Sequence, residues 1–306
     1  NWNAFVFQND AFNWGGRPVF HGYSARTNAT LKSFWSVNLG ASWSPKYYDD
    51  VLLRGGPEAA QPSSIYSDMS LGTDSRRRVV GNLSAAYAHD VLGGYSKEAS
   101  IKIDFRPTSN VHVNVGPAFE QLYDTERWVR TIADTTANAT FDRRYVLAAL
   151  RQNTLSLETR MDVTVSPTLS FVMYVQPFVS AGRYNGFKEF QTPGQFDFAV
   201  YGANNFARDT ISYDRKTQLY TIDPDKSGPA KPFTLGQPNF NFRSLRGNAV
   251  VRWDYRPGSS LYLVWQQERS DAVRYGEFQA RRDVGSIFRT IPTNVFLIKA
   301  TYWLAR

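Results

Sequence analysis

The strongest constraint in this sequence is a strict alternation of apolar and polar residues. In residues 97–106, Ile101, Ile103 and Phe105 fall on one face, and Lys102 and Asp104 fall on the other. Because successive side chains of a β-strand point to opposite faces, this pattern predicts strands with one apolar and one polar face. Such stretches are about twice as long as the average globular strand of about 5–6 residues. The pattern recurs at 35–43, 79–87, 111–119, 155–165, 169–179, 247–256 and 293–305.

The connections between these stretches are of two kinds. Tight joints centre on Pro107, Pro167 and Pro257, and each proline is followed by small or polar residues that suit a hairpin turn. Long connections cover roughly 46–62, 124–142, 184–240 and 270–291. Short turns that alternate with long loops are typical of an outer-membrane barrel, with the turns on the periplasmic side. We therefore expect the three proline turns on the same side as the C-terminus, and 184–240 on the other.

About twelve strands fit this pattern, which predicts an all-β fold: an antiparallel transmembrane β-barrel occupying residues 1–306 as one domain. An even number places both termini on the periplasmic side. A soluble β-sandwich is the alternative, because its strands also alternate. No apolar run is long enough for a membrane-spanning helix. The expected strands are 1–11, 18–30, 34–46, 63–73, 77–90, 95–106, 109–123, 143–165, 168–183, 241–256, 259–270 and 293–305.

Charge and cysteine content narrow the partners and the location. The 35 Lys and Arg against 27 Asp and Glu give a net charge of +8, but the basic residues are scattered, so we expect no nucleic-acid partner. The absence of cysteine excludes disulfides and thiol chemistry, and it is compatible with an exported protein. The predicted location is the outer membrane of a Gram-negative bacterium. The expected partners are the lipid bilayer or lipopolysaccharide, with other subunits and glycans as further candidates.

The segment from Phe240 to Gln267 resembles the C-terminal region of a bacterial family of unknown function. It contains the run Arg252-Trp253-Asp254-Tyr255-Arg256-Pro257-Gly258. Residues 176–182, 187–189, 294–299 and the Leu53–Pro57 loop are also similar. Members of that family carry an N-terminal carbohydrate-binding domain of the family 9 type, followed by a long outer-membrane-like β region. The resemblance implies that this chain is the C-terminal part of a larger barrel, that an upstream domain is missing, and that residues 1–11 form an unpaired edge.

Motifs for catalysis and metal binding are scarce. His21, His89 and His112 lack the local spacing of a zinc site, and we expect all three to be ordinary polar residues. No nucleophile elbow or nucleotide-binding loop occurs. The sequence leaves enzymatic activity open and favours its absence. Asp223, Asp225 and Ser227, followed by Gly228, imitate the start of a calcium loop, but an ordinary surface turn is the preferred interpretation and no other cofactor is expected.

The polar strand faces carry the remaining candidate site. We predict that its charged residues point into the lumen, where opposite signs on neighbouring strands pair across the ladder. They would either line a pore or brace a plugged membrane anchor. Trp35, Trp43, Trp253, Tyr255, Tyr302 and Trp303 are the expected headgroup-level girdle. The rival functions are a carbohydrate-binding or carbohydrate-processing protein and a soluble binding module. The predicted lumen-lining residues are Lys102, Asp104, Arg106, Glu158, Arg160, Asp162, Arg252, Asp254 and Lys299.

Overall fold

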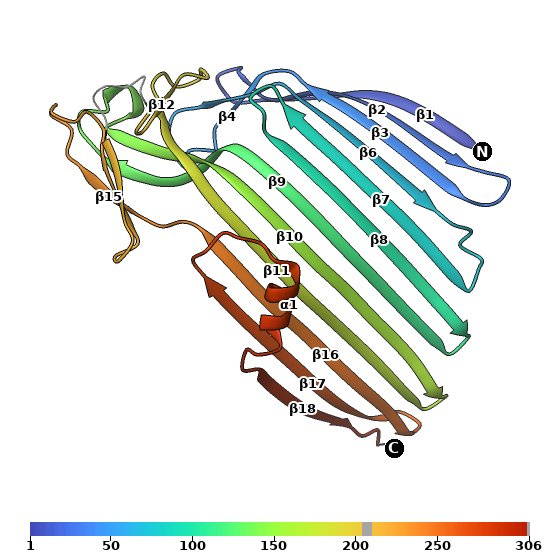
Figure 1. The fold of residues 1–306 in the computed structure, drawn as a ribbon. Helices are drawn as coiled ribbons and strands as arrows, with labels where there is room; N and C mark the ends of the chain where they lie inside the picture. The colour runs from blue at the N-terminus through green and yellow to red at the C-terminus, as the bar shows by residue number, and fades with distance from the viewer. Residues whose placement is uncertain (204–209, 305–306) are drawn as a thin grey trace.

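One antiparallel sheet dominates the computed structural model, which describes residues 1–203 and 210–304 (Figure 1). Each main strand pairs with the next one along the chain, in the order β1-β2-β3-β6-β7-β8-β9-β10-β11-β16-β17-β18, and β12 (Phe198–Val200) pairs with β11. All twelve predicted strands are confirmed. Their bounds are β1 Trp2–Phe12, β2 Pro18–Thr30, β3 Ser36–Ser44, β6 Ser64–Gly72, β7 Val79–Asp90, β8 Tyr95–Thr108, β9 Val111–Ala133, β10 Arg143–Ser166, β11 Leu169–Phe190, β16 Phe240–Arg256, β17 Ser259–Val273 and β18 Thr293–Thr301.

The long connections contain structure that the sequence pattern did not predict. Strands β9 and β11 continue well beyond their predicted ends at 123 and 183, to Ala133 and Phe190. The loops add two small sheets, a 3-10 turn (Asn138–Thr140) and one helix, α1 (Ala280–Ile287). The small sheets are formed by β4 (Tyr47–Asp49) with β5 (Ala59–Gln61), and by β13 (Thr210–Asp214), β14 (Leu219–Asp223) and β15 (Phe233–Gly236). No helix in residues 1–203 and 210–304 is long and apolar enough to cross a membrane.

The two ends of the sheet differ as predicted. The register joins Thr108 to Val111, Ser166 to Leu169 and Arg256 to Ser259, so the three connections at or next to the prolines are tight hairpins at one end. Thr301 of the last strand pairs with Ser260, which places the C-terminus at that same end. Residues 191–203 and 210–239 lie at the opposite end, with the small β13–β15 sheet (Figure 1). The prediction about the turns, the C-terminus and the long loop is therefore confirmed.

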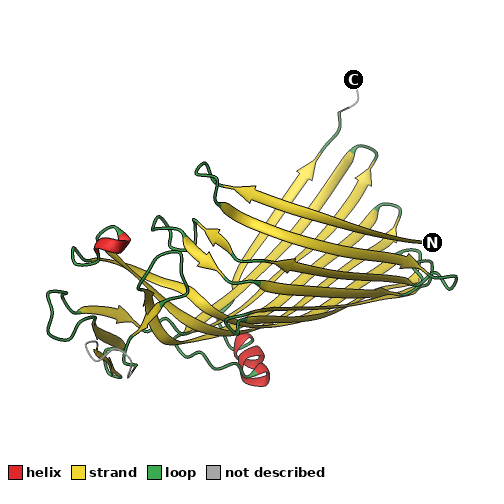
Figure 2. Cartoon of the chain, turned by 90° about the horizontal axis from the view of Figure 1, so that it is seen from above, coloured by secondary structure: helices red, strands yellow, loops and turns green. Residues whose placement is uncertain are grey.

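The sheet is curved, and its two faces differ in chemistry. Figure 2 shows a trough whose convex side carries α1. The register keeps apolar side chains in line across this side from strand to strand, as in the row Ile101, Leu83, Leu71 and Val37. Opposite them, the concave side carries most of the charged strand residues. Near β18 the concave side also carries apolar residues, among them Val250, Val264 and Leu297.

The sheet does not close in the described residues. Strand β1 pairs only with β2, and β18 pairs only with β17, so each has one free edge. The closed barrel expected for a complete membrane domain is thus not observed, because the curvature does not bring β1 and β18 together. The unpaired edge at residues 1–11 is the outcome that we expected from the longer family members.

Most of the buried apolar residues lie at the loop end. One cluster joins Val146, Ala148 and Phe187 to Tyr201, Ile222 and Leu235 of the long loop. A second joins Leu147 and Tyr145 to Leu53, Ala59 and Phe190. Both faces of β10 are covered here, which explains why β9, β10 and β11 continue beyond the single-layer part of the sheet. We call this packed end, residues 45–63, 124–150, 183–203 and 210–239, the loop layer.

Candidate functional site: the concave face

All nine predicted lumen-lining residues lie on the concave face. The ladder pairs Asp162 with His112, whose ring contacts Asp104, and it pairs Arg252 with Tyr262, which pairs with Lys299. The remaining members follow by alternation along the same strands. The prediction that these side chains share one face is therefore confirmed, and their role as lumen-lining residues stays a prediction.

Three charged pairs among the nine predicted residues form along strands, whereas the prediction was pairing across the ladder. Arg106 is 3.0 Å from Asp104, Arg160 is 3.1 Å from Asp162, and Arg252 is 3.1 Å from Asp254. The long guanidinium side chain reaches the carboxylate two residues away, because that residue lies on the same face of the strand. Cross-strand pairs also occur, such as Arg246 with Glu268 at 3.3 Å.

One cross-strand pair spans an entire intervening strand. Arg26 of β2 lies 3.3 Å from Asp68 of β6, across Gly40 of β3. A Cβ atom at position 40 would lie 2.4 Å from Oδ1 of Asp68, so any larger residue there would displace the aspartate side chain. Gly40 thus lets the Asp68 side chain lie across β3, where Arg26 reaches it.

Three carboxylates that sequence reasoning missed meet in a hollow on the concave face. Glu98 of β8 lies directly opposite Glu120 of β9, and the same row continues through Ala86 to Asp68. The hollow has a volume of about 450 Å³ and is also lined by Tyr66 and by the hydroxyl groups of Ser70, Ser84, Ser100, Thr154 and Ser156. Each acid follows the alternation of its own strand, but only the register shows that the three share one row. We call Asp68, Glu98 and Glu120 the acidic row.

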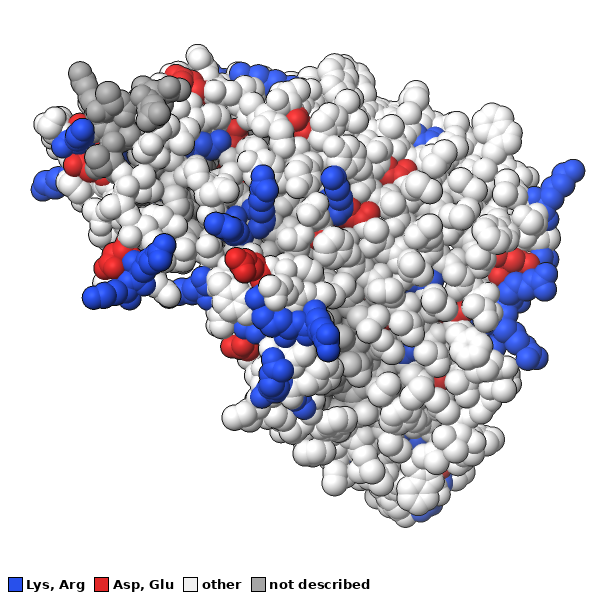
Figure 3. All heavy atoms as spheres, viewed as in Figure 1, with Lys and Arg blue, Asp and Glu red and all other residues white. Residues whose placement is uncertain are grey.

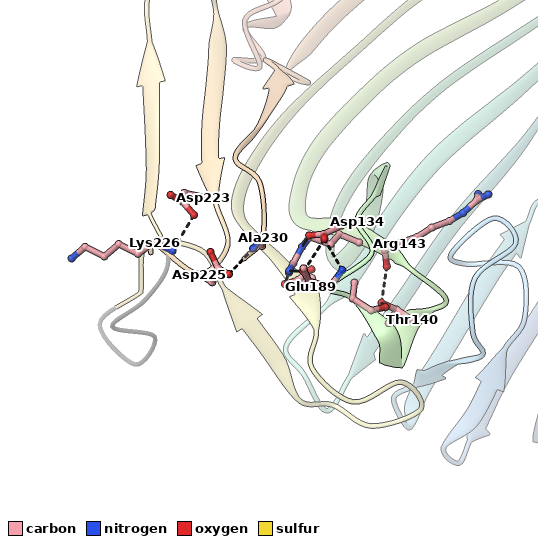
Figure 4. Close-up of polar contacts among 11 residues, drawn as sticks. Asp134, Thr140, Arg143, Glu189, Asp223, Asp225, Lys226 and Ala230 are labelled. Atoms are coloured by element: carbon pink, nitrogen blue, oxygen red, sulfur yellow. Dashed lines mark hydrogen bonds and ion pairs between the residues drawn. The ribbon is translucent and has the colours of Figure 1, made fainter. Parts of the chain in front are cut away.

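A largely buried ion-pair network braces the loop layer. Nε of Arg144 lies 2.6 Å from Oδ2 of Asp134, and Nη1 of the same residue pairs with Oε1 of Glu189 (Figure 4). Nη2 donates to Thr136 Oγ1 at 3.2 Å. All three charged side chains are at most 15% exposed. Burial is the largest influence on the pKa of Glu189 and raises it, while Arg144 opposes that effect. The network therefore ties β10 and β11 to the connection between β9 and β10.

Glu126 is a buried acid of the loop layer. The residue is 5% exposed, and neither carboxylate oxygen has a hydrogen-bond partner within the part of the chain that the structure describes. Burial raises its pKa from 4.5 to about 7, against the opposing charge of Lys188 and with smaller contributions from Asp124 and Asp90. Burial in turn lowers the pKa of Lys188. The folded protein therefore favours the protonated form of Glu126, because ionising the buried carboxyl group costs free energy.

This raised pKa predicts a loss of stability between pH 4.5 and pH 7. In that window the unfolded chain releases the Glu126 proton and the folded chain keeps it, so the unfolding free energy falls as pH rises, by about 3 kcal/mol in total. Urea titrations from pH 4 to pH 8 should show the fall in the parent protein and a flatter profile in Glu126→Gln. The exposed Glu277→Gln serves as the control and should keep the parent profile; a parent-like profile in Glu126→Gln would refute the assignment.

The calcium-loop candidate uses its oxygens to close its own turn. Asp223 Oδ1 accepts from the backbone N–H of Lys226 at 2.9 Å, and Asp225 Oδ2 accepts from Ala230 at 2.8 Å (Figure 4). The backbone N–H of Ser227 donates to the Asp225 carbonyl at 2.7 Å. In residues 1–203 and 210–304, no three His, Cys, Asp or Glu side chains are grouped as metal ligands. This geometry fits the surface turn that the sequence favoured, and calcium binding stays a prediction.

Exposed aromatic rings lie near both ends of the convex face. At the loop end, Tyr23 and Trp43 stack with ring centroids 5.6 Å apart. At the turn end, Trp253 meets Tyr255 edge to face at 5.9 Å. Trp43 and Trp253 are 48% and 49% exposed, which is unusual for tryptophan in a water-facing surface. Their positions match the predicted girdle, and the membrane contact itself stays a prediction.

A protein family matches most of the chain. Residues 16–305 match DUF5916, described as a domain of unknown function. No curated protein is significantly similar to the chain. A weak structural similarity exists to the NanC porin in a rhombohedral crystal form, with 7% sequence identity, a TM-score of 0.26 and coverage of 99% of both chains.

Proposed function

The chain belongs to the DUF5916 family, and we propose that it forms the wall of an outer-membrane β-barrel whose concave face lines a water-filled pore. The observation that carries this proposal is the uncovered apolar convex face. Ile101 is 47% exposed, Phe296 is 73% exposed and Ile298 is 75% exposed. A lipid environment stabilises such a surface, whereas water does not.

The same observation argues against a soluble β-sandwich. In a sandwich the apolar face of each sheet packs on a second sheet about 10 Å away. Outside the loop layer, α1 is the only element among the described residues that packs on the convex face of the large sheet, and the small sheets pack at the loop end. Strands β1 to β8 of the large sheet also have 9 to 14 residues, close to the roughly 9–11 residues that cross a bilayer.

A membrane location requires that the free edges of β1 and β18 be covered. Each unpaired N–H or C=O group in hydrocarbon costs several kcal/mol, so open edges do not persist there. We propose that further strands of the full-length protein, or another subunit, complete the barrel. A carbohydrate-binding domain of the family 9 type preceding Asn1 belongs to the same proposal, and the sequence of the complete gene product tests it.

A pore is favoured over a plugged anchor because the concave face is charged and hollowed. With Glu98 directly opposite Glu120, the acidic row places negative charge along the wall, and rings of carboxylates favour cations in pores. In planar bilayers we expect stepwise conductance with a preference for K⁺ over Cl⁻. The double variant Glu98→Gln, Glu120→Gln should shift the permeability ratio toward that of an unselective pore.

The control for this experiment is Glu277→Gln, which removes one exposed carboxylate near α1, away from the concave face. It should leave the permeability ratio unchanged. Insertion without any conductance would contradict the pore and favour the anchor. Equal permeability ratios in the parent and the double variant would remove the acidic row from the proposal while leaving the pore in place.

The hollow also supports carbohydrate binding as a second candidate function. Hydroxyl and carboxylate groups lie beside the Tyr66 ring, a combination that suits a polyhydroxylated ligand. Saturable quenching of pore current by an oligosaccharide, lost in Tyr66→Ala, would support it. We expect no hydrolysis of the glycan.

A further inference from the structure

Arginines are concentrated in and beside α1 in the sequence, and the guanidinium groups of three of them have no partner among the described residues. Arg274, Arg281 and Arg289 are exposed, and their guanidinium groups form no ion pair or hydrogen bond within residues 1–203 and 210–304. Figure 3 shows basic side chains gathered over this part of the sheet, beside a surface with few charges. We propose that these three arginines bind the phosphate groups of anionic lipids in the membrane surface. This inference rests on the proposed membrane location.

The helix is fixed on the sheet by apolar and polar contacts. Ile287 packs with Val179 and Leu245, and Val284 and Phe278 extend the cluster. Next to it, the chain passes so close to β11 that a Cβ atom on Gly276 would lie 2.5 Å from the Gly182 carbonyl oxygen. The arginines therefore project from a helix that is already fixed on the sheet, which lowers the entropic cost of binding a ligand.

The neighbouring arginines hold α1 and its flanking residues in place and are unavailable for a ligand. Arg243 lies 2.9 Å from Asp271 and donates to Ser286 at 2.7 Å. Arg269 donates to the carbonyl of Phe288 at 2.9 Å, just after α1 ends. Arg282 pairs with Asp283 at 2.8 Å. Asp271 and Asp283 are both paired in this way, and the exposed Glu277 is the remaining acid of residues 269–291, so the three free arginines keep an excess of positive charge.

In the proposed barrel, α1 would lie at the boundary between hydrocarbon and headgroups. On β16, the helix contacts Leu245, whereas Trp265 pairs with Ala249, four residues closer to the turn end. Trp265 stacks on Phe296 with ring centroids 6.4 Å apart, as expected for a girdle at the headgroup level. Phe288 and Ile291, immediately after the helix, are 59% and 88% exposed, so apolar side chains stand beside the free arginines.

This arrangement fits a phosphorylated lipid better than a free anion. The guanidinium fork binds phosphate through two parallel hydrogen bonds, and its weak hydration favours an interfacial position. Phe288 and Ile291 supply contacts that only the acyl part of a lipid would use. Arg274, Arg281 and Arg289 together would therefore contact the phosphates while the adjacent apolar side chains enter the membrane.

The test compares lipids that differ only in phosphate. The full-length protein is first folded into phosphatidylcholine vesicles and then transferred to detergent. Its binding of diphosphoryl lipid A and of monophosphoryl lipid A is measured in detergent by native mass spectrometry. We expect the triple variant Arg274→Gln, Arg281→Gln, Arg289→Gln to bind diphosphoryl lipid A about 100-fold more weakly than the parent, because each basic side chain near an anionic surface adds roughly a factor of five. The difference in affinity between the parent and the triple variant should be smaller for monophosphoryl lipid A.

A matched control removes three exposed basic residues from the outer loops: Arg215→Gln, Lys216→Gln, Lys231→Gln. It should bind like the parent. Insertion of the parent into phosphatidylcholine with equal lipid A binding in both triple variants would overturn this inference and leave the membrane proposal intact. Failure of the parent to insert into any vesicle would instead contradict the membrane proposal itself. Competition by inorganic phosphate at equal concentration would show a general anion site and would also overturn the assignment to lipid.

Discussion

Replacing Arg144 with alanine is expected to destabilise the protein by about 3–5 kcal/mol. The substitution leaves the carboxylates of Asp134 and Glu189 buried without their shared counter-charge, and removing one partner of a buried ion pair typically has a cost of that size. The loop layer should lose its packing first, because the network joins β10 and β11 to the connection between β9 and β10. Urea unfolding, together with proteolysis of the 191–239 segment, measures both effects.

Arg143→Ala provides the matched control. Arg143 is the adjacent residue in β10, and its side chain is exposed on the opposite face. We expect a change of less than about 0.5 kcal/mol there, as for most surface substitutions. Equal effects of the two substitutions would show that the network contributes nothing beyond an ordinary surface contact.

Val251→Arg is expected to reduce the free energy of folding into a bilayer by about 2–4 kcal/mol, because Val251 lies on the convex face between Phe171 and Leu263. Asn248→Arg on the same strand places the same side chain on the concave face, between Tyr174 and Gln266, and should cost far less. Equilibrium folding into vesicles of defined thickness gives both free energies. If both variants folded as stably as the parent, the assignment of the two faces would be wrong.

The alternation predicted the large sheet because it is a local property of each strand. In β8, Ile101, Lys102, Ile103 and Asp104 already show which residues share a face. Tight proline turns then leave only antiparallel pairing with the next strand, so the strand order followed from the same pattern.

The loop layer was not predictable in the same way. Val146, Leu147 and Ala148 are all buried, so β10 loses its alternation where both of its faces are covered. Helix α1 has only eight residues, and its position depends on contacts with Val179 and Leu245 that lie far away in the sequence. Short elements of this kind are stabilised by tertiary contacts more than by local preference.

The candidate site was predictable as a face but not as a set of contacts. Alternation placed Arg160 and Asp162 on one face, whereas their pairing along the strand depends on side-chain length. The acidic row depends on register between strands, since Asp68, Glu98 and Glu120 come from β6, β8 and β9. Register is set by the turns together with the buried pattern, and a shift of one residue would move each acid to the other face.

The central claim is that the convex face meets lipid and the concave face meets water. Because the chain contains no cysteine, single cysteines can be introduced without background. The most direct measurement is the labelling of Ile101→Cys, Lys102→Cys, Ile103→Cys and Asp104→Cys by a membrane-impermeant maleimide in vesicles. We expect rapid labelling at positions 102 and 104, which face water, and protection at positions 101 and 103, which face lipid. Equal labelling at all four positions would contradict the central claim.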